Sequence, residues 1–449
     1  MHDVKKWGYD EGGTNMVACA RFGVRISVLI IVALCLPKLG VLYFQSRAYL
    51  TNMPIDSSFK LGIENVTDEF LRSLTPKGDL SYTVGLVTNQ TGKDLKGVRT
   101  IDILRTRGLT IKKIFVPEHG LDGTIQHHID SGPMVDTITG IPIITLYAYN
   151  QGTTKTLDKQ ALRDIDVLMF DMQEVGMRHT TYLTTLFQTL ETAATHNKTM
   201  VVFDRPNMLG SCMEGPLVED GLKSAISYAA IPVRHGMTIG ELAVYFNDHG
   251  MRHKARLEVV PMQNYNRHQA IPSSLDTRLS ANIHNKNSCF GYSMLGLLAE
   301  VRPFDVALGT DKAFQCISLP DSVKFSQRRW YELHSLLKDH GIDAQFHRFF
   351  SPRKKQYCSG LWLHIDDMNK IAAFKSLLMV LNFFKKSGVE LKFSAAFDKA
   401  VGTQKVREFL EGKMSKYELE LGINGYLYEF FNKATLAFKY WPYPYVVQL

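Results

Sequence analysis

Along 59–262, short apolar runs alternate with segments in which apolar residues recur every three or four positions. The runs predict strands and the recurring positions predict helices. Leu183 and Leu186 recur at helical spacing and belong to a helix predicted over 180–196. Strands that alternate with helices are typical of a parallel sheet with crossover connections, so we expect a Rossmann-like parallel sheet domain of the α/β class over 59–285. Short apolar runs predict its strands at 82–88, 111–116, 143–147, 167–170 and 200–203.

A further helix is predicted over 238–247 from its start signal. Thr238 stands at the N-cap position and Glu241 follows three positions later, which is the pattern of a capping box. The sequence therefore predicts that this helix begins directly after Thr238.

The character of the chain changes after about residue 290. A helix-like segment spans 366–384, and an aromatic tail spans 440–445. We therefore expect a second, smaller α+β domain over 286–449, packed beside the first.

The N-terminal segment over 1–50 carries a targeting signal. An apolar run over 26–36 follows Arg21 and Arg25, as in a secretory n-region and h-region. The run is short for a membrane helix but could extend to a segment over 26–44, so a cleaved signal peptide and a signal anchor both stay open, with a buried helix as a third interpretation. Positive charge before the run predicts export, to the periplasm, to the inner membrane facing the periplasm, or to the medium.

Composition indicates a folded protein, since 45% hydrophobic and 21% charged residues are near the average for globular chains. A length of 449 residues favours two domains. The net charge of +8 is spread along the chain without a basic block or a DNA-binding motif, so nucleic acid is not an expected partner. The six cysteines include no C-x-x-C pair, which argues against structural zinc, and in an exported protein some of them could be oxidised.

Polar and ionisable side chains follow four of the predicted strands. Because open parallel sheets bind ligands at the carboxyl ends of their strands, we expect these side chains to meet in one cleft. They are Asn89 after the first strand, Glu118 and His119 after the second, Asp171 and Glu174 after the fourth, and Asp204, Arg205 and Asn207 after the fifth.

Nucleotide binding is disfavoured by the same strand ends. No G-x-G-x-x-G follows the first strand, and G-x-x-x-x-G-K-[ST] is absent from the sequence. The chain therefore lacks the glycine turn that brings a phosphate to a helix N-terminus.

Each strand-end carboxylate has a structural interpretation, as a helix cap or an ion-pair partner. Two carboxylates beside a cleft are also what glycosidic cleavage requires, one as general acid and the other as base, nucleophile or charge stabiliser. A nearby Arg178, Arg205 or Arg234 could bind the carboxylate of an acidic sugar through its planar fork.

Five ordered segments of the chain are similar to one known family. They are FVPEHGLDG (115–123), TGIPIITLY (139–147), DVLMFDMQEVGMRHTTYLTTL (166–186), FDRPNMLGSCMEGP (203–216) and IPVRHGMTIGELAVYFN (231–247). In this order they resemble the exo-lytic β-N-acetylmuramidases of the NamZ type, which release N-acetylmuramic acid from the non-reducing ends of peptidoglycan fragments. The similarity extends over about 82–310.

The resemblance implies a cleft between the two domains and an enzyme that needs no cofactor and no metal. It implies that Glu118 is the catalytic acid/base, with His119 beside it and Glu174 in the same catalytic set. Together with the strand-end argument, it gives the expected substrate-binding residues: Asn89, Asp171, Arg178, Tyr182, Asp204, Arg205, Asn207, Glu214, Arg234, His235 and Glu300.

The chain also departs from the family pattern. Where relatives typically have Glu-Gly-Thr-Asn-Val-Ser-x-Gly-Arg-Gly-Thr, the segment 300–310 lacks the asparagine and the Gly-Arg pair, and the usual Ser-Pro-Asn is Ser280-Ala281-Asn282. Two hypotheses follow. The protein is an exported glycosidase that acts on muramyl sugars, or it is a glycan-binding protein of the same fold that has lost turnover.

Overall fold

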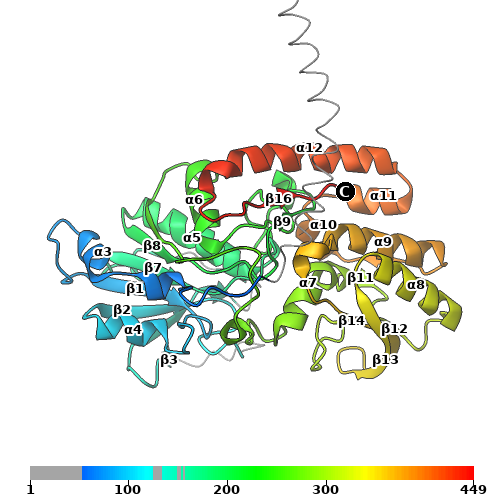
Figure 1. Cartoon of the computed structure of the whole chain (residues 1–449), viewed down its shortest axis with the longest axis horizontal. Coiled ribbons are helices and arrows are strands. Elements are labelled where there is room, and N and C mark those ends of the chain that lie inside the picture. The colour runs from blue at the N-terminus through cyan, green and yellow to red at the C-terminus, as the bar shows by residue number, and fades with distance from the viewer. Residues whose placement is uncertain (1–52, 125–133, 149–152, 155–156) are drawn as a thin grey trace, which may run out of the picture. The chain divides into compact units, whose positions relative to one another are not determined.

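Seven strands form a central sheet in the order β10-β8-β7-β1-β2-β4-β3 (Figure 1). Its neighbouring strands run parallel except for β3 and β4. The computed structural model describes residues 53–124, 134–148, 153–154 and 157–449. The strands of the sheet are β1 (Thr83–Thr88), β2 (Thr110–Val116), β3 (Met134–Val135), β4 (Pro142–Thr145), β7 (Val167–Asp171), β8 (Thr199–Phe203) and β10 (Arg256–Val260).

Helices cover both faces of this sheet, which explains why its central strands are apolar at most positions. Leu168 and Phe170 of β7 pack in one core with α5 and α6, whereas Val167 and Met169 pack in another with α2, α3 and α4. A strand that is buried on both faces is a continuous apolar run in the sequence. These helices are α2 (Gly62–Asn65), α3 (Asp68–Ser73), α4 (Thr100–Thr106), α5 (Thr181–Thr195) and α6 (Ile239–His249).

A smaller antiparallel sheet, in the order β12-β14-β13, organises the following part of the chain. We call 285–411 the second lobe and the described residues of 53–284 the sheet lobe. Leu295, Leu333, Leu361 and Leu377 join the helices and the small sheet of the second lobe in one apolar core. Its elements are α7 (Lys286–Leu298), β11 (Val301–Arg302), β12 (Cys316–Pro320), α8 (Gln327–Asp339), β13 (Asp343–Ser351), β14 (Gln356–His364), η3 (Met368–Lys370), α9 (Ala373–Lys386), β15 (Lys392–Phe393), α10 (Ala395–Val401) and α11 (Lys405–Glu411).

The C-terminal segment returns to the sheet lobe. Helix α12 (Lys416–Ala434), orange-red in Figure 1, contributes Leu427 and Phe430 to the core that contains α5 and α6. The short strand β16 (Tyr445–Val446) then pairs in parallel with β9 (Cys212–Met213). The remaining short elements are β5 (Tyr147–Ala148), β6 (Thr153–Thr154), η1 (Asp220–Leu222), η2 (Ser273–Leu275) and η4 (Thr435–Ala437).

The predicted strands correspond to β1, β2, β4, β7 and β8, and the helices predicted over 180–196 and 238–247 correspond to α5 and α6. The expected capping box is also present. The Thr238 hydroxyl accepts a hydrogen bond from the Glu241 amide at 3.3 Å, and the Glu241 carboxylate accepts one from the Thr238 amide at 3.0 Å. The mixed α/β architecture, with a mostly parallel sheet and a smaller region of antiparallel strands, is confirmed.

The prediction of a helix over 366–384 is wrong for residues 366–372. Helix α9 begins only at Ala373, and the residues before it form the short 3₁₀ turn η3. The carbonyls of Met368 and Ile371 accept hydrogen bonds from Arg234 of the sheet lobe, at 2.7 and 2.9 Å. The backbone of this stretch therefore bonds to the other lobe, which periodicity along the sequence does not show.

The structure does not test the expectations for the N-terminal segment or for the domain boundary. The targeting signal expected over 1–50, with its membrane segment over 26–44, lies outside the described residues. Within the described ranges, no helix has both the length and the apolar character that crossing a bilayer requires. The division at residues 285 and 286 stays a prediction. The cysteines of the described part are buried thiols: Cys212, Cys289, Cys316 and Cys358.

Candidate active site

A cavity of about 190 Å³ lies where β2 ends, and three of the predicted site residues line it: Glu118, His119 and Tyr182. Its wall also includes the first turn of α5, the connection over 279–283, and Tyr292 of the second lobe. This is the carboxyl edge of the parallel sheet, where the sequence predicts a cleft. A larger cavity of about 510 Å³ beside α5 and α6 contains none of the predicted site residues, so we place the candidate site at the smaller one.

Glu118 stands at the N-terminus of α5. The Thr181 hydroxyl donates a hydrogen bond of 2.8 Å to Glu118 Oε2, and Thr181 is the first residue of that helix. A helix N-terminus favours negative charge, so α5 and its threonine together hold a carboxylate here. His119 has a φ of 76°, a left-handed conformation that is uncommon for a non-glycine residue. The chain therefore turns sharply after β2 and presents both side chains to the cavity.

Glu174 lies behind this wall rather than on it. Its side chain is buried, and it is not among the residues that line the cavity. Glu174 Oε1 accepts a hydrogen bond from the Thr180 hydroxyl at 3.1 Å, and Oε2 accepts one from the Gly176 amide. Consecutive threonines at the start of α5 therefore bond to the two glutamates, Thr180 to Glu174 and Thr181 to Glu118.

His235 is fully buried against Glu174. The Nε2 atom of His235 lies 3.4 Å from Glu174 Oε2, while its Nδ1 accepts a hydrogen bond from the Met237 amide at 3.2 Å. An imidazole that accepts at Nδ1 carries its proton on Nε2, so the N–H faces the carboxylate. Of the two side chains, Glu174 is the one that contacts the start of α5, through the Thr180 hydroxyl.

Asp171 and Arg205 form a buried ion pair beneath the strand ends. Arg205 Nε and Nη2 donate to the two oxygens of Asp171 at 2.5 and 2.9 Å, and Nη2 also donates to the Lys93 carbonyl at 2.8 Å. Thr100 at the start of α4 bonds to the same carboxylate. Bidentate pairing of this kind fixes the orientation of the guanidinium relative to the carboxylate. Both groups therefore join β7, α4 and the loop after β8.

Asp204 is buried at the start of α6. Its oxygens accept hydrogen bonds from the Thr238 hydroxyl at 2.9 Å, the Gly240 amide at 2.7 Å and the Tyr440 hydroxyl at 2.6 Å. Burial, with a contribution from the charge of Glu241, raises the pKa of Asp204 to about 6. Asp204 therefore ties α6 to the aromatic tail.

Arg178 is held by backbone carbonyls. Its guanidinium donates to the carbonyls of Ala400 and Val401, at 2.8 and 2.7 Å, where α10 ends, and to two carbonyls and a hydroxyl of the sheet lobe. Burial lowers the pKa of Arg178 to about 9. A cation suits the C-terminal end of a helix, so Arg178 joins the two lobes.

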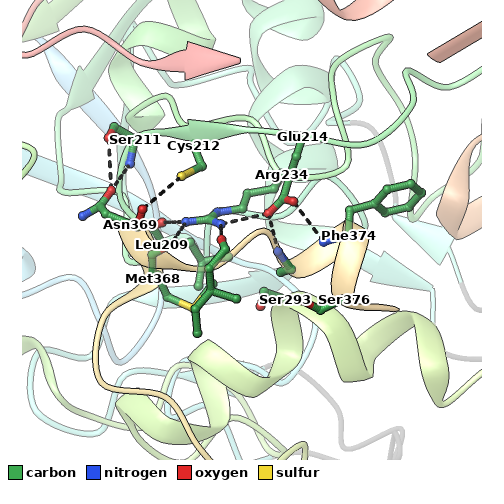
Figure 2. Close-up of polar contacts among 12 residues, drawn as sticks. Leu209, Ser211, Cys212, Glu214, Arg234, Ser293, Met368, Asn369, Phe374 and Ser376 are labelled. Carbon is green, nitrogen blue, oxygen red and sulfur yellow. Dashed lines mark hydrogen bonds and ion pairs between the residues drawn. The ribbon is translucent and has the colours of Figure 1, made fainter. Parts of the chain in front are cut away.

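Arg234 and Glu214 form a second junction between the lobes (Figure 2). Arg234 Nη1 donates to Glu214 Oε1 at 2.8 Å, and the guanidinium also bonds to the carbonyls of Leu209, Met368 and Ile371. The oxygens of Glu214 accept the Ala373 and Phe374 amides at 2.9 and 3.0 Å. These amides begin α9, which has no capping side chain of its own. Glu214 therefore caps a helix of the other lobe.

Asn207 and Asn89 stabilise local turns, whereas Glu300 bonds to a residue far along the chain. Asn207 and Asn89 accept bonds from nearby amides, of Leu209 at 2.8 Å and Thr91 at 2.9 Å. The Glu300 carboxylate accepts a bond from the Ser394 hydroxyl at 2.6 Å. None of these three side chains is among the described residues that line the cavity.

Tyr292 lines the cavity without having been predicted. Its hydroxyl donates to the His179 carbonyl at 2.8 Å, and the two rings stack with centroids 4.9 Å apart. Burial raises the pKa of Tyr292, and the charges of Glu174 and Glu118 raise it further. Its position in α7 follows the ordinary apolar spacing of a core helix, so no sequence pattern indicates that it lines a cavity.

Comparisons with known proteins identify a family that this chain matches. Family profiles described as "Exo-beta-N-acetylmuramidase NamZ", N-terminal and C-terminal, match residues 84–286 and 290–440. Peptidoglycan beta-N-acetylmuramidase NamZ of Bacillus subtilis (strain 168) is 32% identical over 378 residues, which cover 81% of this chain and 86% of that protein.

Two solved structures from Bacteroides fragilis NCTC 9343 share the fold. One DUF1343 family protein has 27% identity and a TM-score of 0.73, covering 85% of this chain and 99% of that one. A second has 23% identity and a TM-score of 0.66, covering 86% and 99%. The similarity therefore extends through both lobes.

Proposed function

The chain belongs to the NamZ family of exo-β-N-acetylmuramidases, and from that premise we propose that it is a glycoside hydrolase that releases N-acetylmuramic acid from the non-reducing ends of peptidoglycan fragments. The observation that carries the proposal is the cavity at the end of β2, where Glu118 is the carboxylate among the described lining residues. A cavity of about 190 Å³ is below the roughly 300–1,000 Å³ of sites for larger ligands, which suits one terminal sugar.

Glu118 is the proposed acid/base. Cleavage of a glycosidic bond needs a proton on the leaving oxygen and removal of a proton from the attacking water. Thr181 engages Glu118 Oε2, whereas Oε1 makes no hydrogen bond to any residue in the described ranges. The proposal is that Glu118 Oε1 donates the proton to the departing sugar and then accepts one from water. His119 beside it is proposed to orient the sugar.

Glu174 is proposed to position this machinery. The Glu174 carboxylate is only 5% exposed and holds Thr180 and the Gly176 amide. It therefore fixes the first turn of α5, from which Thr181 reaches Glu118. In this proposal Glu118 contacts the substrate and Glu174 acts through the helix.

The segment that departs most from the family pattern gives the loss-of-turnover alternative no support. The described lining residues include none of 301–308, the segment that differs most from the family pattern. We therefore retain the glycosidase.

Export is part of the proposal. The basic residues before the apolar run at 26–36 support transport of the chain out of the cytoplasm, with 26–44 as an anchor if the signal is not cleaved. Fractionation of cells that produce the full-length chain, with sequencing of its N-terminus, tests this. Recovery from the cytoplasm alone would exclude it.

Release of sugar from two isomeric disaccharides tests the proposed function. The full-length chain should release N-acetylmuramic acid from MurNAc-GlcNAc but not from GlcNAc-MurNAc, because its site accepts the non-reducing end. Glu118→Gln should bind MurNAc-GlcNAc without releasing sugar, while Asp122→Asn, an exposed neighbour outside the cavity, should behave as wild type. Binding without release by the wild-type chain would overturn the hydrolase and favour a glycan-binding protein.

A further inference from the structure

None of the three arginines expected to bind the acidic substrate is among the described residues that line the cavity. Arg178, Arg205 and Arg234 are buried, and their guanidinium groups bond to carbonyls and carboxylates of the protein. The described residues that line the cavity include no arginine and no lysine. A carboxylate in this cavity would therefore be bound by other donors, and amide and hydroxyl groups can serve.

The connection over 279–283 is held rigidly at the cavity. The Leu279 amide donates to the Ile283 carbonyl at 2.8 Å, which closes the turn. The Leu279 carbonyl accepts bonds from the Tyr182 hydroxyl at 3.1 Å and from Gln90 Nε2 at 2.9 Å. The backbone of this turn is thus fixed to α5 and to the loop after β1, so its side chains need little reorganisation to bind a ligand.

Two polar side chains of this turn line the cavity together with Glu118: Ser280 and Asn282. Ser280 Oγ accepts hydrogen bonds from the Asn282 and Ile283 amides, at 3.4 and 3.2 Å, which leaves its O–H to donate. The Asn282 side chain makes no hydrogen bond to any residue in the described ranges, and it is partly exposed. Unused donors therefore stand in the same cavity as the proposed acid.

We propose that Asn282, with the Ser280 hydroxyl, binds the lactyl carboxylate that distinguishes N-acetylmuramic acid from N-acetylglucosamine. The inference rests on the proposed function, since it names the residues that select the acidic sugar of that reaction. Neutral donors hold an anion through hydrogen bonds to its oxygens, which add geometric specificity. Asn282 is thus a specificity-determining residue of the site.

Calorimetric binding of monosaccharides to the full-length chain tests this without requiring turnover. The probes are N-acetylmuramic acid, its lactyl amide and N-acetylglucosamine. Asn282→Ala should weaken binding of N-acetylmuramic acid by about 10- to 100-fold, the range for a hydrogen bond to a charged group, and should change binding of N-acetylglucosamine little. Asn282→Asp should weaken binding of the free acid more than binding of the lactyl amide, because the new carboxylate repels only the acid. Asn287→Ala, an exposed asparagine outside the cavity, is the matched control and should bind as wild type.

Several outcomes would overturn the inference. One is equal affinity of the wild-type chain for the acid and its lactyl amide. The others are a preference for the acid over the amide that is unchanged in both Asn282 variants, and a preference that is lost in His119→Gln alone. Unfolding transitions of the variants separate a lost contact from a lost fold. The proposed function is judged separately, by sugar release from the disaccharides, so a chain that releases N-acetylmuramic acid but keeps its preference without Asn282 would refute the inference alone.

Discussion

The Thr181 hydroxyl donates a hydrogen bond to Glu118, the proposed acid/base, so its contribution to the rate can be measured by substitution. Thr181→Val keeps the shape of the side chain and removes the donor. We expect kcat to fall about 10- to 100-fold with little change in KM, because one hydrogen bond to a charged group contributes about 1.5–3 kcal/mol and here serves to orient the acid. Thr181→Ser should restore most of the rate. A loss of the same size in Thr181→Ser would show that packing, rather than the hydroxyl, matters.

His179 makes the stability of the fold depend on pH. Burial, and then the charge of Arg178, lowers its pKa from 6.5 to about 3. The folded chain therefore resists protonation that the unfolded chain accepts, so this histidine reduces the free energy of unfolding as pH falls from about 6.5 towards 3 and has no effect above that range.

The matching variant is His179→Leu. Its free energy of unfolding should fall less steeply on acidification than that of wild type, by about 1.4 kcal/mol per pH unit within the window. Urea unfolding at pH 7, 6, 5 and 4 measures both slopes. Parallel slopes in the two proteins would contradict a buried, neutral histidine.

At the residue scale, the sequence predicted which side chains are ionisable and near a strand end, but not which of them face the cavity. Glu118 and Asp171 both follow apolar strands, yet Glu118 lines the cavity and Asp171 is buried against Arg205. The difference depends on the residues packed around each carboxylate. Those residues come from distant segments, as Thr100 of α4 does for Asp171, so the sequence pattern around each carboxylate does not reveal them.

At the element scale, α9 depends on charges from the other lobe. Arg234→Met would leave the Glu214 carboxylate buried without its cation, and we expect a loss of about 3–5 kcal/mol in the free energy of unfolding. Arg234→Lys should recover little, since an ammonium lacks the fork that reaches several acceptors. Chemical denaturation measures the change.

An exposed ion pair of the same chemistry provides the control for that prediction. Arg348 and Asp321 of the second lobe are 59% and 35% exposed, so Arg348→Met should cost no more than about 1 kcal/mol. Equal effects of Arg234→Met and Arg348→Met would contradict a structural role for the buried pair.

Elements that depend on local signals were predicted well, and those that depend on docking were not. The capping box of Thr238 and Glu241 is contained in four consecutive residues, so α6 could be placed from the sequence. The start of α9 is set by Glu214 and Arg234, more than a hundred residues earlier in the chain. The pattern over 366–384 could not reveal them.

At the scale of the whole molecule, the site is formed by two lobes that the chain crosses more than once. Glu118 and Asn282 come from the sheet lobe, and Tyr292 comes from the second lobe. The apolar runs predicted the parallel sheet because its strands are buried on both faces. The position of α7 beside the end of β2 depends on how the lobes pack, so Tyr292 could not be predicted.

The central claim is that Glu118 protonates the departing sugar, and its dependence on the leaving group tests that claim most directly. The wild-type chain and Glu118→Gln would be compared on MurNAc-GlcNAc and on a 2,4-dinitrophenyl glycoside of N-acetylmuramic acid, whose leaving group needs no proton. We predict that the substitution slows cleavage of the disaccharide by about 10²–10⁴-fold and slows release of 2,4-dinitrophenolate in the first turnover far less. Equal loss on both substrates, or unchanged cleavage of the disaccharide, would contradict the account.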